Sequence, residues 1–328
     1  MLSMAALLAV GGYDVARATA SLWQGSLGSW YALTSGTLVR AIPLLLTGTG
    51  VAIAFRAGVL NIGAEGQLLI GAATTTAVAL GWPGGGAITV IMALLAGAAG
   101  GALWSGIASV LRARYGVLEV ISTILLNFVA LFLVSWLVRG PLQEPTHAYP
   151  QTVAIAGGVQ LARIAGLGRL HLGIVIALVV PLAAGWGMRS TAAGFRLLAV
   201  GENAAAAASA GMIDVRRVTA LAFLVSGALA GLAGGCEVLG VTFALYENIS
   251  PGYGFTAIAV ALLARLDPWL VIPSALLFAA LESGAGAMQR DAGVPSTVVT
   301  VIEALLILAV VVTQARRARA GGGTPVAA

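Results

Sequence analysis

Long apolar stretches are the feature that most limits how this chain can fold. A helix needs about 20 largely apolar residues to cross a bilayer. Runs near this length lie at 38–55, 86–111, 119–138, 171–188, 218–240, 268–286 and 297–314, and shorter runs lie at 1–13, 66–82 and 253–264. Charged residues make up only 9% of the chain, whereas a soluble domain carries roughly 25%. The sequence therefore predicts an all-α, polytopic transmembrane helical bundle of about ten spans.

The arginines predict the orientation of this bundle. Cytoplasmic loops of membrane proteins carry an excess of basic residues. If the Arg-rich tail at 315–328 is cytoplasmic, ten alternating spans place most of the 17 basic residues inside. We expect a single membrane domain over 1–314, with an external loop at 139–170 and a cytoplasmic segment at 189–217. Both termini are then cytoplasmic, in a bacterial plasma (inner) membrane.

Several kinds of chemistry are disfavoured by the residues that the chain lacks. All of its basic residues are arginine, so it has no lysine for an ATP-binding P-loop. Any ATP that the protein uses must be hydrolysed by another chain, and we expect neither an enzyme nor a cofactor within this one. One cysteine (Cys236) and two histidines (His147 and His171) argue against a metal centre. The arginines are scattered rather than gathered on one face, which argues against nucleic-acid binding.

Polar residues interrupt the apolar pattern at 56–67, within the string FRAGVLNIGAEGQ (55–67). Three glycines break any continuous helix there. Irregular backbone at membrane depth survives only when buried in protein or lining a water-filled cavity, and transporters commonly bind substrate at such breaks. The amides of Asn61 and Gln67 suit a polyol because they both donate and accept hydrogen bonds. A plain cytoplasmic loop between two spans is the other interpretation.

A second break is predicted within 246–265, where YENISPGYGFT (246–256) precedes a short apolar run. It could close a path from outside or form an ordinary external turn. Five carboxylates lie in or beside apolar runs, and such groups are costly and usually functional at membrane depth. They are Glu65, Glu119, Glu237, Glu282 and Glu303. Glu119 fits an interfacial anchor at a helix start, whereas Glu282 and Glu303 could line a cavity or satisfy one helix contact.

The segment at 189–217 contains a helix signal. Asn203 is a favoured N-cap residue, the following AAAAASA is rich in the best helix former, and Gly211 suits the position after a helix end. A short helix over about 204–210 is predicted. A polar loop with one helical turn is the alternative.

Several strings, in order along the chain, resemble the permeases of simple-sugar and nucleoside ABC importers. This family belongs to a larger group with the ribose and branched-chain amino-acid permeases. The matching strings are FRAGVLNIGAEGQLLIGA (55–72), STILLNFVALFLVSWLVRGPLQEP (122–145), GFRLLAVGEN (194–203), AGMIDVRRV (210–218), GYGFTAIAVALLAR (252–265) and ALESGAGAMQRDAGVP (280–295). The chain departs from the family in its shortened first span and in the alanine-rich stretch after Asn203.

The resemblance implies function, partners and two sets of site residues. It implies a permease subunit for nucleosides or simple sugars that pairs with a second, usually different, permease subunit. A cytoplasmic ABC ATPase would carry ATP and magnesium, and an extracytoplasmic binding lipoprotein or periplasmic protein would deliver substrate. Candidate substrate-path residues are Asn61, Glu65, Gln67, Asn127, Tyr253 and Glu282. Candidate residues for coupling to the ATPase are Gly194, Phe195, Arg196, Gly201, Glu202, Asn203 and Gly211.

Two other functions remain open from the sequence. One is an ABC permease for another small polar solute, such as branched-chain amino acids. The other is an ion-coupled secondary transporter with Glu65 or Glu282 as its proton site. A secondary carrier has no need of a docking helix at 189–217, so that segment discriminates between the two mechanisms.

Overall fold

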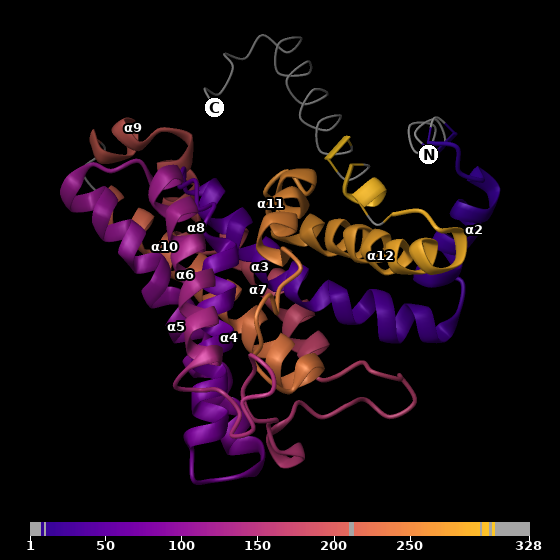
Figure 1. The fold of residues 1–328 in the computed structure, drawn as a ribbon. Coiled ribbons are helices and arrows are strands. Elements are labelled where there is room, and N and C mark those ends of the chain that lie inside the picture. The colour runs from indigo at the N-terminus through magenta and orange to yellow at the C-terminus, as the bar shows by residue number, and fades with distance from the viewer. Residues whose placement is uncertain (1–7, 10, 210–212, 296, 302–303, 306–328) are drawn as a thin grey trace. The chain divides into compact units, whose positions relative to one another are not determined.

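A computed structural model describes residues 8–9, 11–209, 213–295, 297–301 and 304–305. The described residues form helices joined by turns and loops (Figure 1). The helices are α2 (Val15–Ser26), η1 (Ala32–Thr37), α3 (Leu38–Arg56), α4 (Ala64–Gly81), α5 (Gly86–Tyr115), α6 (Glu119–Arg139), η2 (Gly157–Val159), α7 (Gly173–Ser190), α8 (Ala192–Glu202), α9 (Ala204–Ser209), α10 (Val215–Glu237), η3 (Val238–Thr242), α11 (Tyr253–Leu263) and α12 (Pro268–Ala292). Within this described part there is no strand, so the predicted all-α class is confirmed.

Six helices in the described residues are long and apolar enough to cross a membrane, so the predicted count of ten is not confirmed. They are Ala32–Arg56, Gly86–Tyr115, Glu119–Arg139, Gly173–Ser190, Val215–Thr242 and Pro268–Ala292. α11 has only 11 residues, or about 16 Å of helix, which is too short for a span. Glu65 and Gln67 lower the hydropathy of α4, which is mostly buried by its neighbours. Most of the predicted runs 1–13 and 297–314 lie outside the described residues.

Residues 41–275 form one compact unit. Its centre is the packing of α4, α5 and α10 on one another (Figure 1). Glycines allow this contact, because a β-carbon at Gly71 would overlap the backbone of Gly231, and one at Gly101 would overlap the Gly227 carbonyl. Small residues of this kind let helix backbones approach closely in membranes. The abundant glycine of the sequence is thus used in helix packing.

Residues 1–40 and 276–328 contribute to the other compact unit. In it α2 packs on the second half of α12, and the Ser283 hydroxyl donates to the Gly25 carbonyl across 2.8 Å. The sequence did not predict α2, whose polar and apolar residues are mixed. Its start has a local signal, since the Asp14 carboxylate accepts the Arg17 amide at 3.0 Å and caps the helix. The single domain over 1–314 stays a prediction, and 315–328 lies outside the described residues.

The predicted loop at 139–170 is irregular, as its prolines indicate. It runs along the chain that follows α10, with amide-to-carbonyl bonds from Thr152 to Leu245 and from Ile155 to Phe243. The Arg139 guanidinium donates two hydrogen bonds, of 2.6 and 2.7 Å, to the Glu247 carboxylate. Those bonds, with a further one from the Ser135 hydroxyl, lower the pKa of Glu247 to about 2. Glu247 therefore stays ionised at neutral pH and fastens the chain that follows η3 to the end of α6.

Candidate functional site

The predicted interruption of the helices near 56–67 is confirmed, with α3 ending at Arg56 and α4 beginning at Ala64. We call residues 57–63 the helix break. Gly58 has φ +71°, a conformation that favours glycine. Gly63 lies so close to α6 that a β-carbon would come within 3.0 Å of the Thr123 Cβ. The glycines thus both turn the chain and let the break pack closely.

Asn61 anchors the middle of the helix break and is fully buried. Its Nδ2 donates to Gln67 Oε1 at 3.0 Å and to Ser226 Oγ at 2.9 Å. Its Oδ1 accepts from Gln67 Nε2 at 2.8 Å and from the Gly63 amide at 3.1 Å. Both donors and both lone pairs of this amide are used within the protein. Asn61 and Gln67 therefore hold α4 and α10 together, a role that the sequence did not reveal.

Asn127 fastens the same break to α6. Its Oδ1 accepts the Gly66 amide at 2.8 Å, and its Nδ2 donates to the Ile62 carbonyl at 2.9 Å. The hydroxyl of Thr123, one turn earlier on α6, accepts the Ile62 amide at 3.3 Å. Since a buried backbone group without a partner is costly, these side chains replace the hydrogen bonds that a continuous helix would make.

The two predicted breaks meet at Glu65. Its carboxylate accepts the amide of Gly254, in the first turn of α11, at 2.7 Å. The Ser250 hydroxyl also bonds this carboxylate. A β-carbon at Gly254 would overlap the Glu65 backbone, so the starts of α4 and α11 are in direct contact. Tyr253, the first residue of α11, is buried at this junction.

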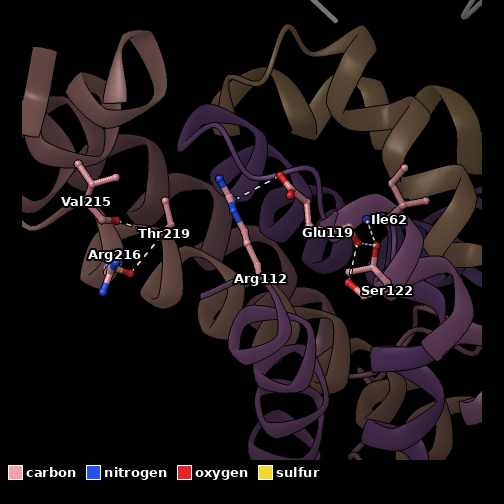
Figure 2. A network of polar contacts seen from close by, with 8 residues as sticks. Ile62, Arg112, Glu119, Ser122, Val215, Arg216 and Thr219 are labelled. Atoms are coloured by element: carbon pink, nitrogen blue, oxygen red, sulfur yellow. Dashed lines mark hydrogen bonds and ion pairs between the residues drawn. The ribbon is translucent and has the colours of Figure 1, made fainter. Parts of the chain in front are cut away.

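Three of the other predicted carboxylates lie on α6, α10 and α12. Figure 2 shows Glu119, in the first turn of α6, facing Arg112 at the end of α5, with 3.3 Å between Oε1 and Nη1. The interfacial anchor expected for Glu119 stays a prediction. Glu237 is buried at the end of α10. Glu282 lies on α12, in the compact unit to which residues 1–40 and 276–328 contribute. Glu303 lies outside the described residues.

The segment 189–217 contains two helices where one was predicted. α9 begins after Asn203, whose Oδ1 accepts the Ala206 amide at 2.9 Å, so the predicted cap is confirmed. The longer α8 was missed, although Thr191 caps it by accepting the Gly194 amide at 3.1 Å. Phe195 is 68% exposed, and Arg196, Glu202 and Asn203 are exposed as well. Gly211 lies outside the described residues.

Two glycines allow both ends of α8 to pack closely against the backbone of neighbouring segments. A β-carbon at Gly194 would overlap the Met188 carbonyl at the end of α7, and one at Gly201 would overlap the Arg56 carbonyl. Across the same contact, a β-carbon at Gly58 would lie 3.6 Å from the Gly201 Cα. The last turn of α8 therefore rests directly on the first residues of the helix break. No local pattern predicts this contact, because the two segments are far apart in the chain.

Among the described residues, no group of three or more His, Cys, Asp or Glu side chains could hold a metal ion. The polar side chains of the site instead bond one another and the backbone. The geometry is that of a broken-helix junction joined to an exposed two-helix segment, within a bundle whose long helices can cross a membrane.

Comparison with known proteins identifies the class to which such a bundle belongs. The family described as the permease component of the branched-chain amino acid transport system matches residues 33–311. This chain belongs to that family of membrane permeases. No solved structure gives a significant match.

Curated relatives match almost the whole chain. A guanosine ABC transporter permease protein of Bacillus subtilis is 38% identical, over 95% of this chain and 90% of its own length. A glucose ABC transporter permease protein of Haloferax volcanii is 37% identical, over 96% and 87%. A nucleoside ABC transporter permease protein of Lactococcus lactis subsp. cremoris is 32% identical, over 92% and 85%. Bacillus subtilis has a second guanosine ABC transporter permease protein, 28% identical over 76% of this chain.

Proposed function

We propose that this chain forms half of the translocation path of an ABC importer for nucleosides or related simple sugars. The observation that carries the proposal is the contact of Gly201 with Arg56, which joins the exposed α8–α9 segment to the helix break. The names of the similar permeases, for guanosine, nucleosides and glucose, support the substrate class. Membership of the permease family supports the assignment to an import system.

In this proposal α8 and α9 dock on a cytoplasmic ATPase. The exposed residues Phe195, Glu202 and Asn203 face the ATPase, and α8 passes its movement to the break through Gly201. ATP and magnesium are bound by the ATPase, in agreement with the absence of lysine from this chain. Substrate arrives from an extracytoplasmic binding protein.

The partner permease in this proposal is a second, different chain. The two distinct guanosine permease proteins of Bacillus subtilis that resemble this chain support a heterodimer. Asn61, Gln67 and Asn127 use their polar atoms to hold the break in shape. The Glu65 carboxylate is likewise bonded to Gly254 and Ser250, so Tyr253 and Glu282 are the remaining candidates for substrate contact.

Substrate uptake tests the proposed class. Cells that carry the complete transporter should accumulate labelled guanosine or another nucleoside, or a simple sugar such as glucose or ribose, and cells without this chain should not. Unlabelled substrate should compete, and labelled leucine should not enter through the system. Uptake of leucine alone would assign the chain to amino-acid import instead.

Cysteine labelling tests the proposed orientation, with 139–170 outside and both termini in the cytoplasm. Cys236 is fully buried, so the native thiol should give little background. In intact cells, a membrane-impermeant maleimide should label the His147→Cys variant, and the Ala205→Cys variant should react only after the membrane is opened. The reverse pattern would overturn the orientation.

A further inference from the structure

A cavity of 730 Å³ lies under α8, between the end of α7 and the first half of α10. Its polar wall contains Arg196, Arg217 and Asp214, and its apolar wall includes Leu197, Leu221 and Val225. The volume lies in the range of small-molecule sites, roughly 300–1,000 Å³. None of the residues of the Glu65 junction lines it, so it is distinct from the helix break.

The two arginines of the cavity have no partner among the described residues. Within that part of the chain, the guanidinium groups of Arg196 and Arg217 make neither a hydrogen bond nor an ion pair. Arg189, nearby in sequence, is by contrast paired with Asp267 and stacked 3.7 Å from the ring centre of Trp269. Asp214 is occupied as the cap of α10, where its carboxylate accepts the Arg217 amide at 3.0 Å. The cavity therefore has a net positive wall that can receive an anion.

The rest of the cavity suits a hydrocarbon chain. Arg217, Leu221 and Val225 lie four residues apart on one face of α10, and this stripe extends about 12 Å at 1.5 Å per residue. Leu221 is 51% and Val225 41% exposed, so the cavity opens along the apolar side of a helix that can cross a membrane. A soluble phosphate would use only the arginine end. A ligand with an anionic head and an apolar tail would use the whole stripe.

We propose that this cavity binds an anionic phospholipid, with its phosphate at Arg196 and Arg217 and an acyl chain along Leu221 and Val225. Basic pockets between membrane helices are known to hold lipid head groups. A lipid at this place would lie against α8. The site is independent of the identity of the transported substrate.

Lipid binding to the purified full transporter, measured by native mass spectrometry, tests this proposal. Phosphatidylglycerol should bind more tightly than phosphatidylcholine with the same acyl chains. The double variant Arg196→Gln/Arg217→Gln should weaken phosphatidylglycerol binding by about fivefold for each arginine, or roughly 30-fold together. The matched control is Arg216→Gln, because Arg216 is an exposed neighbour that does not line the cavity. It should leave binding unchanged.

Two further experiments distinguish a lipid phosphate from a soluble phosphate and control for misfolding of the double variant. Glycerol phosphate and inorganic phosphate should not displace the lipid at millimolar concentration. Val225→Trp keeps both arginines, fills the open apolar end of the cavity, and should also weaken phosphatidylglycerol binding. Equal binding of phosphatidylcholine, displacement by inorganic phosphate, or an equal loss in the Arg216→Gln variant would each overturn the proposal.

Discussion

Replacing Gly201 with alanine is expected to remove most ATP-driven uptake while the transporter still assembles in the membrane. The added methyl group would overlap the Arg56 carbonyl oxygen, and a backbone atom cannot turn aside as a flexible side chain can. Overpacking of this kind costs about 1–3 kcal/mol, enough to shift a coupled equilibrium by roughly 5–150-fold. The displaced end of α8 would no longer move together with the helix break. ATP hydrolysis should continue without matching uptake.

Gly81→Ala is the matched control for this experiment. Gly81 ends α4, as Gly201 lies in the last turn of α8, and a β-carbon at Gly81 would meet no atom within 4 Å. It should leave uptake near the unmodified level. The measurement is the number of substrates taken up for each ATP hydrolysed, with the amount of assembled complex determined in parallel. An unchanged ratio in the Gly201→Ala variant would show that this contact does not carry the coupling.

Two substitutions of Glu65 are expected to behave in opposite ways. Glu65→Gln keeps a side-chain oxygen that can accept a hydrogen bond from the Gly254 amide. In the unmodified protein this amide nitrogen lies 2.7 Å from the Glu65 carboxylate. The Glu65→Gln variant should retain most uptake. Glu65→Leu leaves that buried amide without a partner, at a cost of about 1–3 kcal/mol, and loses the bond with Ser250. It should loosen the junction of α4 with α11 and reduce uptake by roughly tenfold or more.

The same pair separates the two transport mechanisms. A secondary carrier that uses Glu65 as its proton site needs a titratable group, so both variants would lose uptake. The measurement is initial uptake for each assembled complex in the membrane. Loss of uptake in the Glu65→Gln variant would contradict the structural role that we assign to this carboxylate.

Local signals in the sequence predicted the parts of the site that depend on neighbouring residues. The glycines and polar groups of 56–67 predicted the helix break, and Asn203 followed by alanines predicted the start of α9. Both features are set within a few residues of the chain. The family resemblance was confirmed for the same reason, since it rested on continuous strings such as 55–72.

Partners that are distant in sequence could not be predicted. Asn61 bonds Ser226, and Gly201 rests on Arg56, but neither residue type indicates its partner. Asn61 was expected to face a substrate, whereas its hydrogen bonds are made within the protein. The helices α2 and α8 were missed because they are short and not continuously apolar. The predicted count of ten spans is not confirmed, because α11 is shorter than a complete span and most of the runs 1–13 and 297–314 lie outside the described residues.

ATP-dependent uptake by the reconstituted transporter tests the central claim most directly. The complex of this chain, its partner permease and the ATPase would be placed in proteoliposomes, with the binding protein and a labelled nucleoside or sugar outside. We predict uptake when the ATPase side is supplied with ATP and magnesium, and none with a non-hydrolysable analogue. An imposed proton or sodium gradient without ATP should have no effect. Uptake driven by such a gradient alone, or uptake that does not need ATP hydrolysis, would contradict the account.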